Sequence, residues 1–384
     1  MQFTLIVIAA LCAVLAVAGA VYFALCTWAA GRFRREAKAV GRVDFEPPVS
    51  VMKSLKGLDR HMYAAFRSHC RFDYAEYELL FGANDPNDPA LELVKRLQRE
   101  FPQRSIRIIS CHQSLGPNGK VSTLAQMLPH AKYEHILIND SDIVAPPDYL
   151  RRVMPAFADE DVGMVTSLYR ALAGRTLSSK MEALGLSSDF MGGVLVAREM
   201  EGGVRFALGA TMATTKSVLR EIGGLEALVD YLGDDYELGA RTAAAGYEVA
   251  LADVVVETAL PDYTVGEFWA HQMRWARNVR DRRRAQYFGL IVTFGLAWGI
   301  LAVLAAPREW WTWVALAIVA LFRVVAAVVI GRGVLEDPCL LRDLWLLPVR
   351  DFVALAVWVA SFAGDEIEWR GLKFRVRDGK LERI

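Results

Sequence analysis

Apolar residues concentrate at the two ends of the chain, and the first group predicts a membrane helix. Residues 3–30 are almost continuously apolar and carry no charge, which is long enough to cross a bilayer. A cleaved signal peptide has a basic start and a shorter apolar core, so we expect residues 1–31 to be a retained anchor. Basic residues follow directly and place that end of the helix in the cytoplasm and the N-terminus outside: Arg32, Arg34, Arg35, Lys38 and Arg42.

The middle of the chain has a different pattern. From residue 47 to about 262, short apolar runs alternate with helical stretches, as in a βαβ domain with a mainly parallel sheet. Strands are predicted at 50–55, 77–85 and 105–110, with a further one starting at residue 136. Helices are predicted at 62–69, 88–101 and around 120–128.

The C-terminal part returns to membrane-like composition. Residues 287–306 and 310–330 predict two crossings, and Arg323 within the second needs a partner or a water-filled cavity. A third stretch, 344–363, is broken by Pro348, Arg350 and Asp351. The tail, 364–384, is basic (Arg370 and Lys373 among others) and favours a cytoplasmic end. The catalytic domain and the tail are both expected in the cytoplasm, so the segment between them must cross the membrane an even number of times. We therefore interpret 344–363 as re-entrant or interfacial within a membrane region of residues 287–363.

Composition narrows the class of protein. Of 384 residues, 54% are hydrophobic and 23% are charged, which suggests a soluble catalytic domain joined to membrane segments. Net charge is zero, so no basic field argues for a nucleic-acid partner. The five cysteines show no C-x-x-C spacing, and neither a disulfide framework nor a zinc site is indicated. A reduced domain facing the cytosol fits best.

The strand that starts at Ile136 carries the first candidate chemistry. It runs into Asp140-Ser141-Asp142, and the prolines at 146 and 147 prevent a longer strand. In open α/β sheets, ligands bind at the carboxyl ends of strands. Side chains alternate along a strand, so we expect the two carboxylates to point the same way and to suit Mg²⁺ or Mn²⁺ with a diphosphate. The alternative is an ordinary strand-ending turn.

Further candidates lie at other element boundaries. Asp85 ends a predicted strand and suits a nucleotide's base or ribose, or else a helix N-terminal turn. Lys120 ends the flexible turn GPNGK and suits a phosphate, or else a surface loop. Asp234 and Asp235 enter a helix, where they either favour the helix dipole or supply a general base.

A basic segment, residues 263–286, precedes the membrane region. Within it, Arg274 offers a guanidinium for phosphate and Trp275 an apolar face for a sugar. For residues 280–284 we favour a topological role at the cytoplasmic end of the next span.

Together these motifs resemble a known family. The segments PPVSVMKSLKGLD, ANDPNDPA, PNGKVSTL, NDSDI, LGATMA, IGGL, DYLGDDYELG and RWAR, spread over residues 47–280, are similar to those of ceramide glucosyltransferases. These are membrane glycosyltransferases of the family-2/21 type with a GT-A fold, and they have bacterial relatives that act on hopanoids. The resemblance implies an α/β, Rossmann-like catalytic domain over 47–262 with transmembrane helices at both ends.

The resemblance also implies roles for individual positions. Asp235 matches the catalytic base, with Asp234 beside it, and Asp142 with Asp140 matches the metal and donor-diphosphate pair. The positions expected to contact the nucleotide sugar are Asp85, Asp140, Lys53, Lys56 and Lys120. The positions expected near acceptor or diphosphate are His271, Arg274, Trp275 and Asp234.

Three positions depart from the family pattern. His271 occupies the place of the usual Gln or Arg in the Q/R-x-x-R-W box, and its charge depends on pH. Ser54 stands where Pro is common and Thr123 where Asn is frequent. The reaction class is unaffected, but donor and acceptor identity do not transfer.

The function implied is an inverting, Mg²⁺- or Mn²⁺-dependent transfer of one hexose or N-acetylhexosamine. The donor would be UDP-glucose or UDP-N-acetylglucosamine, and the acceptor a hydroxyl of ceramide or a polyhydroxylated hopanoid. The expected location is a bacterial inner membrane, with the catalytic domain in the cytoplasm. A processive polysaccharide synthase is the alternative, although such enzymes usually have more membrane helices. A non-catalytic nucleotide-sugar-binding membrane protein is the alternative of another class.

Overall fold

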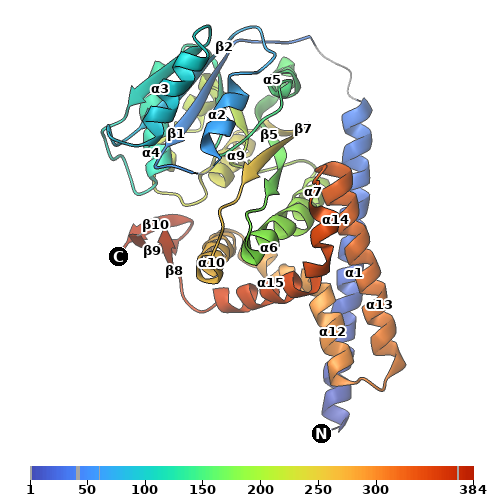
Figure 1. Cartoon of the computed structure of the whole chain (residues 1–384). Helices are drawn as coiled ribbons and strands as arrows, with labels where there is room; N and C mark the ends of the chain where they lie inside the picture. The colour runs from blue at the N-terminus through green and yellow to red at the C-terminus, as the bar shows by residue number, and fades with distance from the viewer. Residues whose placement is uncertain (1, 40–43, 60, 370–371) are drawn as a thin grey trace.

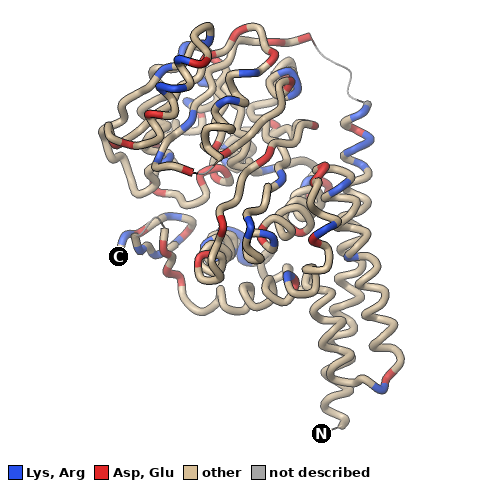
Figure 2. The backbone as a smooth tube through the Cα atoms, in the orientation of Figure 1, with Lys and Arg blue, Asp and Glu red and all other residues tan. Residues whose placement is uncertain are grey.

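The computed structural model describes residues 2–39, 44–59, 61–369 and 372–384. Arg42 and Arg370, two of the basic residues named above, lie outside the described residues. A sheet-containing domain sits at one end of a helical bundle, and the C-terminus ends in a small separate sheet beside the domain (Figure 1). Charged residues are concentrated in the domain and the segments next to it, whereas the far half of the bundle is nearly free of them (Figure 2).

The domain is built on a seven-stranded sheet with the order β3-β2-β1-β4-β6-β5-β7. Only β6 runs against its neighbours, β4 and β5, so the predicted mainly parallel sheet is confirmed. The strands are β1 (Val49–Leu55), β2 (Tyr77–Ala83), β3 (Ser105–Ser110), β4 (His135–Ile138), β5 (Val162–Leu172), β6 (Met212–Thr215) and β7 (Glu248–Ala259). β2 is buried along its whole length, as expected for a largely apolar strand covered on both faces, and its one charged residue, Glu78, accepts a hydrogen bond from Ser50 Oγ at 2.7 Å.

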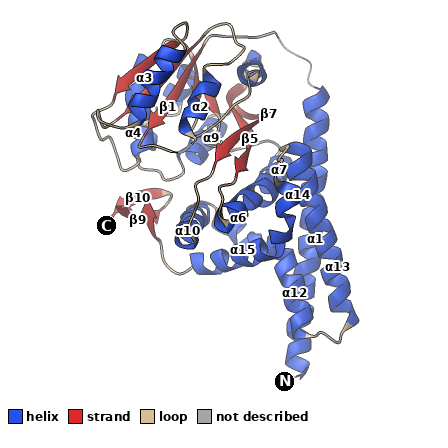
Figure 3. Ribbon diagram, viewed as in Figure 1, coloured by secondary structure: helices blue, strands red, loops and turns tan. Residues whose placement is uncertain are grey.

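Helices cover the sheet on both faces (Figure 3). Those of the domain are α2 (Met62–His69), α3 (Ala90–Glu100), α4 (Gly119–Met127), α5 (Tyr149–Val153), α8 (Lys216–Glu221) and α9 (Asp234–Ala244). Short 3₁₀ turns are η1 (Leu128–His130), η2 (Met154–Ala158) and η4 (Glu226–Leu228). Each strand and helix predicted here is present, and its ends agree to within two residues.

One geometric expectation was wrong. β4 ends at Ile138, so Asp140 and Asp142 lie in the turn that follows and not on alternating strand positions. The buried Asn139 side chain explains the early end, because its Nδ2 donates to Ala210 O at 2.6 Å and to Tyr149 Oη at 3.0 Å. A turn therefore ends this strand, and the metal-binding role predicted for Asp140 and Asp142 remains a prediction.

A helical bundle extends from the domain. It contains α1 (Gln2–Ala39), α11 (Arg284–Gly289), η5 (Leu290–Phe294), α12 (Gly295–Ala305), α13 (Trp310–Ala327) and the π-helical η6 (Val328–Val334). α1 and α12 approach closely, since a Cβ on Gly19 would lie 2.5 Å from Gly295 Cα. By length and composition, four described segments are able to cross a membrane: 2–38, 284–305, 310–334 and 340–361.

The last of these segments differs in direction. It comprises α14 (Leu340–Asp343), η7 (Leu344–Leu346) and α15 (Leu347–Ser361), and α15 runs across the bundle, roughly perpendicular to α1, α12 and α13 (Figure 1). Between domain and bundle lie α6 (Leu177–Gly185), the π-helical η3 (Leu186–Phe190), α7 (Met191–Met200) and α10 (Val265–Arg282).

The basic C-terminal tail forms an antiparallel sheet, which the sequence had not led us to expect. Its strands are β8 (Glu366–Trp369), β9 (Leu372–Arg377) and β10 (Lys380–Arg383). Ile367, Phe374, Val376 and Leu381 form a small core against Leu232, and Lys380 pairs with Tyr231 in an antiparallel bridge. The end of the chain therefore contacts the loop that precedes α9.

Candidate active site

The acidic motifs, far apart in sequence, meet around one lysine. Lys120 Nζ lies 2.7 Å from Asp140 Oδ1 and 3.1 Å from Asp234 Oδ2. Burial alone would lower the pKa of Lys120, but the charges of Asp140, Asp234 and Asp235 outweigh burial and raise it. Lys120 is thus a fixed cation that joins the β4 turn to the start of α9.

Asp235 lies beside this group, at the first turn of α9. Its Oδ1 accepts a hydrogen bond from the Tyr236 N–H at 2.8 Å, and its Oδ2 accepts one from the Gly209 N–H at 3.0 Å. Burial, followed by the negative charge of Asp234, raises the pKa of Asp235 to about 6. A carboxyl group with such a pKa can change protonation near neutral pH, as a general base must.

Gly209 separates two of the carboxylates. A Cβ at this position would lie 3.0 Å from Asp140 Oδ2 and 3.3 Å from Asp235 Oδ2. The absence of a side chain therefore allows both carboxylates to approach the main chain closely.

Asp142 completes the D-x-D motif in a half-buried position. Thr258 Oγ1 donates a 2.5 Å hydrogen bond to Asp142 Oδ2, while burial and the charge of Asp140 raise the pKa of Asp142. Lys53 Nζ donates to the main-chain oxygen of Asp140 at 3.0 Å. Burial lowers the pKa of Lys53 to about 7, against the opposing effect of Asp142 and Asp140. Lys53 therefore supports the turn from within the domain.

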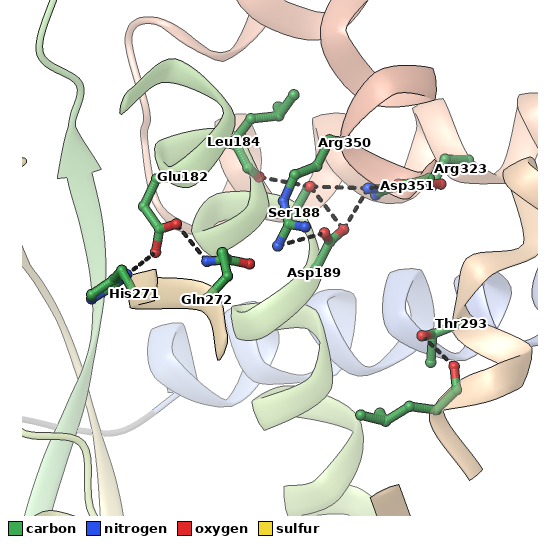
Figure 4. Close-up of polar contacts among 11 residues, drawn as sticks. Glu182, Leu184, Ser188, Asp189, His271, Gln272, Thr293, Arg323, Arg350 and Asp351 are labelled. Atoms are coloured by element: carbon green, nitrogen blue, oxygen red, sulfur yellow. Dashed lines mark hydrogen bonds and ion pairs between the residues drawn. The ribbon is translucent and has the colours of Figure 1, made fainter. Parts of the chain in front are cut away.

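The histidine of the predicted box contacts a residue that the motifs did not reveal. His271 Nδ1 lies 3.3 Å from Glu182 Oε1, and Gln272 Nε2 donates to Glu182 Oε2 at 2.5 Å (Figure 4). Glu182 is buried on α6, whereas His271 and Gln272 lie on α10. Its sequence signal was a single acid within a run of small and apolar residues.

Aromatic rings pack against one another around His271. Trp275 packs edge-on against Phe190 with ring centroids 5.3 Å apart, and Tyr263 stacks on His271 at 5.5 Å. The ring centroids of Tyr169 and Phe190 lie 6.3 Å apart. Burial, followed by the charges of Asp235 and Asp140, raises the pKa of Tyr169.

Two predicted positions lie in other surroundings. Asp85 is exposed after β2, where its Oδ1 accepts from the Asn87 N–H at 2.8 Å, as in a turn that starts a helix. Lys56 is exposed just beyond β1. Arg274 lies on α10 near Tyr263. Burial raises the pKa of Tyr263 to about 12, and the positive charge of Arg274 opposes this increase.

The basic run after the box pairs with protein groups. Arg282 Nη1 lies 2.6 Å from Glu237 Oε2, and Arg283 Nη2 lies 2.9 Å from Glu201 Oε1. Arg280 donates to the main-chain oxygens of Ser361 and Gly364. These side chains bind α10 to α9, to the end of α7 and to the turn after α15.

Searches of known proteins agree with this architecture. A mannosyltransferase from Pyrobaculum calidifontis, solved with GDP-Man and Mn²⁺, superimposes with a TM-score of 0.54 at 20% identity, covering 91% of this chain and 99% of that one. Ceramide glucosyltransferase 1 of Caenorhabditis elegans is 25% identical over 348 residues, which are 87% of this chain and 72% of the relative. Ceramide glucosyltransferase 3 of the same organism is 26% identical over 60% of this chain and 50% of the relative.

Fold and acidic site together define a GT-A glycosyltransferase with membrane helices. The chain belongs to glycosyl transferase family 21, whose model matches residues 11–382. The match includes the C-terminal sheet as far as β10 and most of α1.

Proposed function

We propose that this protein transfers one sugar from a UDP-sugar to a hydroxyl group of a membrane lipid, with inversion at the anomeric carbon. The observation that carries the proposal is the meeting of Asp140, Asp234 and Asp235 around Lys120, with Asp142 next to Asp140 in the same turn. The relatives named as ceramide glucosyltransferases support a lipid acceptor.

The carboxylates of Asp140 and Asp142 suit a divalent cation that is also bound by the diphosphate of the donor. Among the described residues no set of three His, Cys, Asp or Glu side chains converges as a metal cage. Asp140 and Asp142 form a pair whose repulsion contributes to the raised pKa of Asp142, and a cation would relieve that repulsion. Mg²⁺ commonly uses one or two carboxylates and completes its shell with phosphate oxygens and water. When bound, Mg²⁺ or Mn²⁺ would stabilise the negative charge that develops on the leaving UDP.

Asp235 is our candidate for the base. The oxygen of the acceptor hydroxyl forms a bond to the anomeric carbon while the bond from that carbon to the diphosphate breaks. The hydroxyl proton then passes to a carboxylate oxygen of Asp235, which the Gly209 and Tyr236 N–H groups hold in place. Positioning of both substrates contributes to the rate together with the base.

The remaining predicted positions take supporting roles in this proposal. Lys120 would orient Asp140 and Asp234 until the donor enters, and Arg274 and Trp275 would face the diphosphate or the acceptor. Asp85 and Lys56, at the carboxyl ends of β2 and β1, would contact the nucleotide. We further propose that the domain faces the cytoplasm of a bacterial inner membrane and that α15 lies along the membrane surface.

The test uses purified full-length protein with Mg²⁺ or Mn²⁺ and mass spectrometry of the products. UDP-glucose and UDP-N-acetylglucosamine are each paired with ceramide and with a polyhydroxylated hopanoid. We expect a single added sugar on one lipid, and loss of product when EDTA removes the metal. A growing polymer instead would favour the processive synthase, and binding without any UDP release would favour a non-catalytic protein.

A further inference from the structure

A cluster of four charged side chains, three of them buried, lies where α13, α15 and η3 meet. Arg323 is fully buried, and its Nη2 lies 2.9 Å from Asp351 Oδ1 and also donates to Asp189 (Figure 4). Arg350 approaches the same site, with its Nη2 3.7 Å from Asp189 Oδ2. Asp189 and Asp351 therefore supply the partners that Arg323 was predicted to need.

The cluster has more donors than its own acceptors satisfy. Within the part of the chain that the structure describes, Arg323 Nη1, Arg350 Nε and Arg350 Nη1 are buried without a hydrogen-bond partner. Arg350 is only 8% exposed, so these donors are not compensated by bulk water. Unpaired buried donors are unfavourable, so each one in a native structure calls for an explanation, such as a bound group that accepts the hydrogen bond.

The cluster opens on one side. The Asp189 side chain is 31% exposed, in contrast to 0% for Arg323 and 4% for Asp351. Asp189 lies on the π-helical turn η3, and π-helical turns frequently occur at functional sites. A Cβ on Gly185, at the end of α6, would overlap the Arg350 guanidinium, so the glycine allows Arg350 to lie against this helix.

The same helical segment connects this cluster to the catalytic side. Phe190, next to Asp189, packs against Trp275, and Glu182 on the preceding α6 contacts His271. Exposed apolar side chains of α13 and α15 lie on the same helices as the cluster, among them Leu321, Val325 and Val349. A lipid whose chains lie along these helices would bring its polar head to Asp189.

We propose that Asp189 and Arg350 form a subsite for the polar head of an uncharged acceptor lipid. The free N–H groups of Arg350 donate to an amide or hydroxyl oxygen of the lipid, and Asp189 accepts from a lipid hydroxyl. Two arginines and two aspartates leave the cluster without net charge, which gives an anionic phosphate no electrostatic advantage. The inference rests on the proposed function, since it assigns part of the acceptor site.

The experiment compares Arg350→Lys and Asp189→Asn with the parent protein, each as the full chain in nanodiscs of neutral lipid. Arg350→Lys keeps the charge but removes the forked donors, so the two variants change the subsite in different ways. KM is measured separately for ceramide and for UDP-glucose, and binding is followed by cross-linking to a photoactivatable ceramide. We expect the KM for ceramide to rise about tenfold or more, the value for one charged hydrogen bond lost, and cross-linking to fall in parallel.

Arg342→Lys is the matched control. Arg342 lies on α14 in the same region, is paired with its neighbour Asp343 at 2.7 Å, and has a side chain that is 59% exposed. It should leave both KM values and the cross-linking unchanged.

Each alternative outcome has one meaning. Unchanged cross-linking in both cluster variants would overturn the subsite, and so would an equal rise of both KM values together with a lower unfolding temperature. Equal competition by phosphatidylglycerol and by unlabelled ceramide would overturn the preference for an uncharged head. A parent protein that cross-links ceramide at Asp189 and Arg350 but never transfers sugar would contradict the proposed function while leaving the subsite intact.

Discussion

The main-chain N–H of Gly209 donates a 3.0 Å hydrogen bond to Asp235 Oδ2, and the same glycine lies directly beside the Asp140 carboxylate. One residue between β5 and β6 thus fixes the distance between the candidate base and the D-x-D turn. Gly209→Ala would place a methyl group 3.0 Å from Asp140 Oδ2 and 3.3 Å from Asp235 Oδ2. We expect transfer to fall by about tenfold to a hundredfold, because small displacements of catalytic groups carry such penalties. Steady-state kinetics with an unchanged unfolding temperature would verify this result, and full activity would show that the contact is unimportant.

Asp235→Asn should remove the base while keeping the shape of the side chain. We expect a loss of about 10²- to 10⁴-fold in kcat, the usual contribution of general-base catalysis. Binding of UDP, measured by calorimetry in the presence of Mn²⁺, should change little. Near-normal turnover by this variant would rule out Asp235 as the base.

The raised pKa of Asp235, about 6, predicts an acid limb in the rate profile. A base acts only when deprotonated, and a raised pKa means that the proton is retained to higher pH. The rate should therefore be fully developed above pH 7 and fall tenfold per pH unit well below 6.

Asp234→Asn tests whether Asp235 is the group responsible for the acid limb. Its charge contributes to raising the pKa of Asp235, after burial, so its removal should move the acid limb to lower pH. An acid limb that stays in place would mean that another group controls it. The profiles should be recorded as kcat with saturating donor and lipid, so that changes in substrate binding do not intervene.

The C-terminal sheet should affect catalysis through the loop before α9. The Leu381 N–H donates to Asp230 O at 2.7 Å, and the Leu232 N–H donates to Gly379 O at 3.0 Å. Gly379 has a positive φ of 74°, and a Cβ there would lie 2.6 Å from Arg282 Nε. Gly379→Val should therefore loosen the loop that leads to Asp234 and Asp235. We expect a decrease of about tenfold in kcat with a smaller change in the KM for donor.

The exposed Glu382 on the same strand, β10, provides the control, since Glu382→Ala alters charge without touching the loop. It should retain parent-like kinetics. If Gly379→Val also behaved like the parent, the sheet would have no positioning role.

Much of this domain was accessible from the sequence because its elements follow simple periodicities. The strand Ser105–Ser110 and the helix Met62–His69 have the predicted ends. The direction of the Asp140 and Asp142 side chains was not accessible, since it depends on hydrogen bonds that Asn139 makes to residues distant in sequence. Local pattern carries no information about such contacts.

The partners in ion pairs between distant residues were likewise not predictable from the sequence. The need of Arg323 for a partner followed from its place in an apolar helix, but the identity of Asp189 depends on how η3 packs against α13. Glu182 and His271 are likewise brought together only by the packing of α6 on α10. Apolar and basic residues alternate in LKFRVR, the pattern of a strand that became β9. We used the basic charge of this segment only to place the tail in the cytoplasm and did not predict the strand.

The contact between β10 and the loop before α9 makes the acidic site depend on residues far along the chain. Cleavage before residue 379 would leave the seven-stranded sheet and the apolar helices in place but remove the strand that supports the loop leading to Asp234 and Asp235. A proteolysed polypeptide would therefore keep its membrane helices while its carboxylates lost their support.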